Sequence, residues 1–284
     1  MSITHALEKF VHTSDCEPRA DSLIVDGSAL VYSIQPTKGT FEEYAKTFDM
    51  HIEAFAQKHS RVDVIFDQYK TDSLKIHTRK LRGLGQRRKV TSNGHVPKNW
   101  NTLLRDNDNK TELFSMLAKS IYNITSGLVY ATHKASSVSN KIARNAIVCT
   151  HEEADTMIFI HLKHAIQKDV IRTACIIAND TDVIIIAVSH FTQLKSLGLE
   201  QLWVSFGTGK RRRWIPIHDL CAHMGPEKSK GLLFFHAFSG CDTVSGFIGK
   251  GKTYFLQTWN VLPDITETFA KLSRFQVSIC DTDI

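Results

Sequence analysis

The sequence feature that most constrains the fold is an apolar run at residues 176–186, "IIANDTDVIII", which carries two acids near its middle. Asp180 and Asp182 are separated by one residue. A buried carboxylate without a partner costs several kcal/mol or takes up a proton. Because the run is predicted to be a strand of the core, the pair indicates a place where positive charge neutralises it.

Composition excludes several classes of protein. With 284 residues, 42% of them hydrophobic and 23% charged, the chain is typical of an ordinary globular protein rather than a disordered or fibrous one. No apolar run approaches the roughly 20 residues of a membrane span, and the first residues lack the apolar centre of a signal peptide. The six cysteines form no CxxC pair. We therefore expect an intracellular protein with reduced thiols and no zinc site; the cluster "KRRR" (210–213) adds a nuclear location as an expectation.

The order of apolar segments predicts an α/β fold. Residues 21–33 and 61–69 each contain a short apolar strand, and between them residues 40–59 have apolar side chains at helical spacing. A strand–helix–strand order favours a parallel sheet. Further strands are predicted in "GLVYAT" (127–132), "NAIVCT" (145–150), "QLWVSF" (201–206) and "RRWIPI" (212–217).

Composition shifts predict the domain organisation. Residues 1–20 form an N-terminal extension, and residues 21–217 form the core. The polar, basic segment 70–108 is predicted to be a long insertion in that core, of the kind that is often functional. Beyond about residue 218 the pattern is wholly helical, which predicts a C-terminal helical lobe over 218–284.

Acids recur where predicted strands end or helices begin. Asp26 and Asp67 each follow an apolar strand, and Thr150 with Glu153 forms a capping-box pattern at the start of a helix. Ligands of parallel sheets bind at the carboxyl ends of the strands, so these acids are expected to converge. Mg²⁺ or Mn²⁺ is the natural counter-charge, and two such ions about 4 Å apart suit phosphodiester cleavage.

Each acid also has a structural interpretation when it is taken alone. Asp26 before Gly27 suits a turn, Glu153 suits a helix cap, and Asp242 suits the start of a helix. The Asp180/Asp182 pair is the hardest to explain in this way. The ordered set as a whole favours a metal site.

The same motifs resemble the PIN-like 5′-nuclease superfamily, which includes the flap endonucleases. The matching stretches are "LIVDGSALVYS", "VIFDQ", "HEEADT", "NDTDV" and "SGCDTVSGFIGKGK", within roughly residues 21–262. More closely still, several of these stretches resemble a PIN-like family that is present in many copies in animal genomes. This second resemblance brings no known activity with it. The acids at the family's metal-binding positions are Asp26, Asp67, Glu153, Asp155, Asp180, Asp182 and Asp242.

This resemblance implies a three-layer α/β/α core with a mostly parallel sheet and a helix–hairpin–helix-like element in the C-terminal lobe. It also implies a metal-dependent, structure-specific 5′-nuclease that acts on DNA or RNA with two Mg²⁺ or Mn²⁺ ions. Glu153, Asp155, Asp180 and Asp182 would hold one ion, and Asp26, Asp67 and Asp242 would complete the second site. The chain departs from the family pattern at Gln68, where glycine is usual, and at Lys250, which lies between two hairpin glycines.

Two basic segments are predicted to hold the nucleic-acid backbone. One corresponds to the basic arch of flap nucleases and the other to the phosphate-gripping hairpin. Taken singly, each residue is as well explained by solvated surface. The positions are Lys75, Arg79, Lys80, Arg82, Arg87, Arg88 and Lys89 in the first segment, and Gly249, Lys250, Gly251 and Lys252 in the second.

Two alternative functions stay open from the sequence. One is a catalytically idle PIN-like scaffold that binds nucleic acid or protein. The other is a phosphatase of the haloacid dehalogenase type, in which "DTDV" would make Asp180 the nucleophile and Asp182 the acid. That motif normally opens its domain, and it leaves Asp26 and Asp67 unexplained.

Overall fold

A computed structural model describes residues 3–36, 38–69, 85–141, 146–149, 151–241, 244 and 246–274. The chain divides into two compact units, which are treated separately here. The N-terminal unit comprises residues 21–161. The C-terminal unit comprises residues 1–20 and 162–284.

The described residues of the N-terminal unit contain four strands. The strands β1 (Ser22–Asp26), β2 (Arg61–Ile65) and β3 (Leu128–His133) run parallel, in the order β1-β2-β3. The strand β4 (Ser136–Ser139) pairs with β3 in the antiparallel sense. Every residue of β2 is buried, as expected for an inner strand of a parallel sheet.

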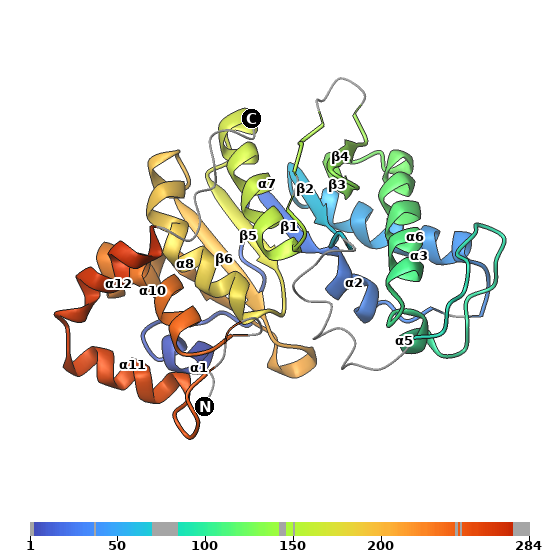
Figure 1. Cartoon of the computed structure of the whole chain (residues 1–284). Coiled ribbons are helices and arrows are strands. Elements are labelled where there is room, and N and C mark those ends of the chain that lie inside the picture. Colours follow the sequence, from blue (N-terminus) through green and yellow to red (C-terminus); the bar gives the residue numbers. More distant parts are fainter. Residues whose placement is uncertain are drawn as a thin grey trace. The chain divides into compact units, whose positions relative to one another are not determined.

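Helices connect these strands. They are α2 (Gly27–Ser33), α3 (Phe41–Ala56), α5 (Trp100–Leu103), α6 (Asn107–Ser120) and the 3₁₀ turn η1 (Ile121–Asn123). A capping box between Thr40 and Glu43 starts α3. The buried face of α3 includes Phe48 and Ile52, and this helix packs against β2 and α6, while α6 packs against β3 (Figure 1).

The C-terminal unit has three strands and a buried helix. Helix α7 (Ala154–Asp169) enters it from the N-terminal unit and leads to β5 (Thr173–Ile177). The strand β6 (Gln201–Phe206) is parallel to β5, and β7 (Arg213–Pro216), which follows the 3₁₀ turn η2 (Gly209–Arg211), is antiparallel to β6. Between β5 and β6 lies α8 (Thr181–Ser196). The strands of both units thus confirm the predicted α/β class with a mostly parallel sheet.

The described chain after β7 contains four helices and no strand, in line with the predicted helical C-terminal lobe. These are α9 (Ile217–Met224), α10 (Pro226–Phe238), α11 (Lys252–Val261) and α12 (Ile265–Ser273). Helix α10 packs against α8 and α12 (Figure 1). The rings of Phe235 and Trp259 stack with their centroids 5.1 Å apart, and Phe269 meets the edge of this pair.

The residues predicted as an N-terminal extension pack within the C-terminal unit. Helix α1 (Ile3–Glu8) buries Ile3 and Leu7 and contacts α8 and α11. Glu8 forms an ion pair with Arg213 of β7. The predicted boundary between core and lobe at residues 217 and 218 stays a prediction, because the division into units concerns packing alone.

Two predicted elements differ from the structure. The run 176–186 is not one strand, because β5 ends at Ile177 and α8 begins at Thr181. Val183, Ile184 and Ile185 are successive buried residues of that helix. A helix buried on all sides lacks amphipathic periodicity, so sequence alone cannot distinguish it from a buried strand.

The other correction concerns the strand predicted at residues 145–150. The first strand, by contrast, ends at Asp26 as expected, and α2 follows it. Residues 146–149 of the predicted strand "NAIVCT" are not a strand, and β4 at Ser136–Ser139 is the partner of β3 instead. A two-residue turn brings β4 directly back along β3, which occupies the pairing edge of that strand.

No helix in the described part of the chain has the length and apolar character needed to cross a membrane.

Candidate metal centre

Asp26 and Asp67 lie at the carboxyl ends of neighbouring parallel strands. Asp26 is the last residue of β1 and the N-cap of α2, where its Oδ1 accepts a hydrogen bond from the Ala29 N–H at 3.1 Å. Gly27 is required here by close packing, since a Cβ atom would lie 2.5 Å from the ring of Phe66. Asp26 therefore has a local structural role, as the sequence suggested, and the structure shows that this role is a helix cap. The cap places the Asp26 carboxylate at the edge where ligands of parallel sheets bind.

Asp67 follows β2 and joins three segments of the N-terminal unit. Its Oδ1 accepts a hydrogen bond from the Ala154 N–H, the first residue of α7, at 2.9 Å. Its Oδ2 accepts weaker bonds from the hydroxyls of Ser28 at 3.3 Å and Tyr69 at 3.4 Å. The Gln68 N–H donates to the Glu152 carbonyl at 2.8 Å. The "HEEAD" segment is thus fixed at the end of β2.

The start of α7 is later than predicted. The helix begins at Ala154, and Thr150 of the predicted capping box lies outside the described residues. Glu153 and Asp155 flank the helix start, and both are half-buried. Asp155 lies in the first turn, where an acid is stabilised by the helix dipole.

Asp155, Asp180 and Asp182 each place a carboxylate oxygen within 4.8 Å of the others. Among the described residues, this is the one group of three or more acidic, His or Cys side chains that comes so close. Asp155 is carried by α7, which is continuous and belongs to the C-terminal unit from Leu162 onward. Asp180 is the N-cap of α8, and its Oδ1 accepts from the Asp182 N–H at 2.9 Å.

These three carboxylates fit a hard divalent cation. Mg²⁺ binds oxygen ligands at about 2.0–2.1 Å, so two oxygens around it lie at most about 4.2 Å apart, and the about 2.3–2.6 Å of Ca²⁺ allows about 5 Å. The three carboxylate oxygens lie within 4.8 Å of one another, which is close to the spacing that one such cation requires. An all-oxygen donor set suits Mg²⁺ or Mn²⁺ better than zinc, which prefers nitrogen and sulfur. Asp26, Asp67 and Glu153 are outside this close group.

His236 supports Asp182 from helix α10. Its Nε2 lies 2.9 Å from Asp182 Oδ1, and its side chain is only 12% exposed. Lys252 holds the other side of His236, because its ammonium donates to the His236 carbonyl at 2.8 Å and lies 3.3 Å from the ring Nδ1. Groups that contact a carboxylate ligand fix its orientation toward a metal. Sequence reasoning missed this contact, which joins residues far apart in the chain.

Lys252 and Lys250 of the predicted hairpin have different environments. Burial lowers the pKa of Lys252, although its Coulombic interactions with Cys241 and Asp182 raise it in part. Lys250 is exposed, and its ammonium lies 4.1 Å from the ring centroid of Tyr254. Gly249 has φ +73, a conformation that favours glycine, and Gly251 is the N-cap of α11.

The predicted basic segment is described only in part. Lys75, Arg79, Lys80 and Arg82 lie outside the described residues, as does the acid Asp242. Arg87 forms an ion pair with Glu112 at 2.5 Å and also donates to the Asn109 amide oxygen. Arg88 and Lys89 are exposed. Their contact with nucleic acid stays a prediction.

Sequence reasoning also missed a buried charged network in β2. Asp63 accepts hydrogen bonds from Arg61 Nε and Nη2, both at 2.7 Å, and its Oδ1 lies 2.7 Å from His161 Nδ1. All three side chains are at most 1% exposed. The Arg61 guanidinium also lies over the ring of Tyr130. Alternating charged and apolar residues in "RVDVI" were the available signal.

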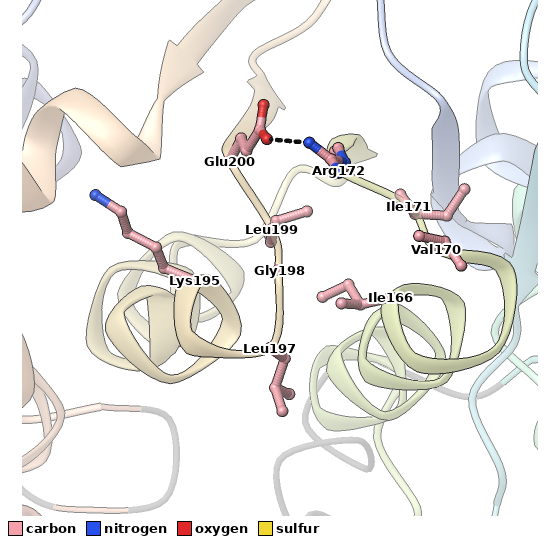
Figure 2. A pocket seen from close by; sticks show the side chains of 9 residues that line it. All are labelled: Ile166, Val170, Ile171, Arg172, Lys195, Leu197, Gly198, Leu199 and Glu200. Atoms are coloured by element: carbon pink, nitrogen blue, oxygen red, sulfur yellow. Dashed lines mark hydrogen bonds and ion pairs between the residues drawn. The ribbon is translucent and has the colours of Figure 1, made fainter.

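A separate hollow of about 570 Å³ lies at the amino ends of β5 and β6 (Figure 2). Figure 2 shows the ion pair between Arg172 and Glu200, which are 2.9 Å apart, at its rim. Val170 beside it adopts φ +55. Because Asp180 follows the carboxyl end of β5, this hollow is distinct from the acidic group.

Comparisons with known proteins give distant structural likenesses. A scan against family models and a search of curated proteins both found no match. Among solved structures, human GEN1 in complex with Holliday junction DNA has a TM-score of 0.44 at 12% identity, covering 96% of this chain and 63% of GEN1. This chain thus spans less than two thirds of the GEN1 chain.

Two further solved structures are similar to the same extent. The bacteriophage T5 5′-exonuclease with bound zinc has a TM-score of 0.47 at 14% identity, covering 92% of this chain and 81% of that one. The catalytic core of Rad2 in complex with a DNA substrate has a TM-score of 0.48 at 13% identity, covering 99% and 77%.

Proposed function

We propose that this chain is a PIN-like, metal-dependent nuclease that hydrolyses phosphodiester bonds of nucleic acid, in the manner of structure-specific 5′-nucleases. The observation that carries the proposal is the group formed by Asp155, Asp180 and Asp182. The ordered acids of the sequence support it. In this proposal Glu153 joins these three around one ion, and Asp26, Asp67 and Asp242 serve a second.

The residues of the chain have separate tasks in this mechanism. When bound, Mg²⁺ or Mn²⁺ would neutralise the scissile phosphate and stabilise its attacking and leaving oxygens. Asp180 presents its carboxylate at the start of α8 while one oxygen accepts a hydrogen bond from the Asp182 N–H, which fixes its rotamer. His236 would limit the movement of the Asp182 carboxylate, because its Nε2 lies 2.9 Å from Asp182 Oδ1. Asp67 stays oriented through the Ala154 N–H.

Basic residues would hold the nucleic-acid backbone. Arg88, Lys89 and Lys250 are exposed cations suited to phosphate contact. Arg87 and Lys252 make internal contacts, so their contribution would be to keep their segments in place. Lys75, Arg79, Lys80 and Arg82 of the basic insertion, with Gly249 and Gly251 of the hairpin, complete the proposed surface.

Cleavage of labelled substrates tests this proposal. Wild-type protein and the Asp180→Asn/Asp182→Asn double variant would be incubated with 5′-flap DNA, single-stranded DNA and single-stranded RNA in Mg²⁺ or Mn²⁺. We expect metal-dependent cutting by the wild type and none by the double variant. The product ends would identify the substrate and the polarity.

Two other results would lead to the alternative functions. Absence of cutting by both proteins, with nucleic-acid binding unchanged by metal, would contradict the nuclease and favour the binding scaffold. A phosphoryl group trapped on Asp180 would instead favour the phosphatase.

A further inference from the structure

A second hollow, which we call the Tyr69 pocket, lies within the N-terminal unit beside Asp67. It has a volume of about 460 Å³ and is bounded by the carboxyl ends of β2 and β3 and by α6. The residues used below are Asp67, Tyr69, Phe114, Ser115, His133 and Lys134. This volume falls within the roughly 300–1,000 Å³ of small-molecule sites. Its position at strand carboxyl ends is the usual one for ligands of parallel sheets.

One wall of the Tyr69 pocket is aromatic. The rings of Tyr69 and Phe114 lie 6.3 Å apart between centroids and are tilted by 34°. Phe114 in turn stacks on Phe66 at 4.7 Å, so its ring is fixed by the core. The ammonium of Lys110 lies 4.1 Å from the Tyr69 centroid, on α6. Aromatic rings with a cation nearby suit a ligand that has a planar aromatic ring and, next to that ring, a negatively charged group.

Another part of the lining is polar. Ser115 Oγ and His133 Nε2 share a hydrogen bond of 2.9 Å. Burial lowers the pKa of His133, and the charges of Lys119 and Lys134 lower it further, which favours the neutral ring. A hydroxyl and a neutral imidazole each donate or accept. Such a pair satisfies the polar edge of any heterocycle without selecting one.

Lys134 stands at the rim in a conformation that ordinary side chains avoid. It has φ +57 and occupies the first position of the two-residue turn between β3 and β4, where glycine is favoured. Its carbonyl accepts a hydrogen bond of 2.5 Å from the Gln68 amide, which fixes the turn beside Asp67. Backbone strain of this kind concentrates at functional sites. The lysine at this turn position places a cation in the lining of the pocket.

We propose that the Tyr69 pocket binds one unpaired nucleobase of the nucleic-acid strand whose phosphate lies at Asp67. This inference rests on the proposed function, because it names the form of substrate that the same acids would act on. The base lies against Tyr69 and Phe114 with its polar edge toward Ser115 and His133. Lys134 faces the adjoining phosphate. A fully paired base is stacked within its duplex and does not enter.

Fluorescence of 2-aminopurine tests the pocket without any cleavage. A single-stranded DNA oligonucleotide with one 2-aminopurine, labelled with fluorescein at its far end, would be titrated with full-length protein in EDTA. Quenching of 2-aminopurine reports stacking of that base, and fluorescein anisotropy reports binding of the strand as a whole. The variants are Tyr69→Leu, which removes the aromatic wall, and Ser115→Leu, which fills the pocket. Tyr122→Leu is the control, since Tyr122 is 57% exposed in the same unit and does not line the pocket.

We expect quenching in the wild type and in Tyr122→Leu, and its loss in both pocket variants, with strand affinity about tenfold weaker. Equal quenching in all four proteins would overturn the base pocket, as would strand binding without quenching in the wild type. Those two results would leave the proposed nuclease intact, because it is tested by metal-dependent cutting. Absence of any strand binding in the anisotropy measurement would count against both proposals.

Discussion

Strand β2 and the residues after it carry two aspartates, four positions apart, whose surroundings differ in burial and in charge. Asp63 is completely buried, its charge is compensated within the protein by Arg61, and His161 lies within hydrogen-bond distance of it. Asp67 is half-buried, and its described partners are uncharged: a backbone N–H and two hydroxyls. The charge of Asp63 is therefore balanced by contacts inside the protein. The charge of Asp67 is oriented but not neutralised by these partners, which is the condition for holding a cation.

This comparison teaches how to separate structural acids from candidate ligands. Burial would raise the pKa of Asp63, but the charge of Arg61 and the hydrogen bonds from Arg61 and His161 outweigh it and hold the pKa at about 2. The protein therefore keeps Asp63 ionised without any external ion. A metal is expected instead where several carboxylates come close together, as at the group formed by Asp155, Asp180 and Asp182.

The largest expected effect is on catalysis. In the proposed mechanism Asp67 serves a metal ion, and loss of such a residue removes several kcal/mol of transition-state stabilisation, so Asp67→Asn should lower the rate of cutting by roughly a thousandfold. Its unfolding midpoint in urea should stay close to that of the wild type, since the amide oxygen still accepts the Ala154 N–H. Asp264→Asn is a matched control, because Asp264 is exposed and its side chain makes no capping bond. A rate for Asp67→Asn equal to that of the control would break the comparison.

The opposite change is expected at Asp63. Asp63→Asn leaves Arg61 buried without its counter-charge, which should lower the free energy of unfolding by about 3–5 kcal/mol. Urea titration followed by circular dichroism measures this loss. The combined variant Arg61→Met/Asp63→Leu/His161→Leu, which leaves no charge buried, should lose less than Asp63→Asn alone. A larger loss in the combined variant would show that the network itself, rather than the unpaired charge, stabilises β2.

The third prediction concerns acid. The pKa of Asp63 is about 2 in the folded protein and 3.8 in its ordinary state. Because the folded pKa is the lower one, the ionised carboxylate stabilises the protein fully above about pH 4, and this contribution of about 2 kcal/mol is lost as the pH falls toward 2. Urea midpoints measured between pH 5 and pH 2 should fall more steeply for the wild type than for Asp63→Asn. Parallel curves for the two proteins would contradict this assignment.

A smaller effect is expected where a side chain contacts a candidate ligand without being one itself. His236→Gln should weaken Mn²⁺ binding by about tenfold, because Asp182 loses the group that orients it. Calorimetric titration with Mn²⁺ alone provides the measurement, independently of any cutting. His12→Gln, an exposed histidine of the same unit, is the control. Unchanged affinity in His236→Gln would limit His236 to a structural role.

The smallest effect is expected at a helix cap far in sequence from the acids. Thr40→Ala removes the capping box of α3 and should lower the free energy of unfolding by about 1 kcal/mol without changing cutting. Asp26→Asn should lower the rate of cutting without changing the free energy of unfolding, because asparagine caps a helix as well as aspartate but offers no negative charge. Thermal unfolding and cleavage assays on both variants separate the two roles. Equal cutting by Asp26→Asn and Thr40→Ala would place Asp26 among the structural caps.

The sequence alone determined the local structure where the signal lies within a few residues. The apolar pattern of α3, the short strands around β1 and β2, and the helices after β7 follow from side-chain periodicity and from glycines that end segments. The position of acids directly after strands also follows from neighbouring residues. A parallel arrangement then predicts that Asp26 and Asp67 share an edge.

Only the tertiary structure decided which acids are compensated and which elements are buried. Asp63 and His161 are 98 positions apart, and His236 meets Asp182 across 54 positions, so nothing in local sequence marks either contact. The first turns of helix α8 resembled a strand, because residues 183–185 and 187–191 are all buried and leave no exposed face by which a helix is recognised. The free energy of a charge depends on what surrounds it, and packing sets those surroundings.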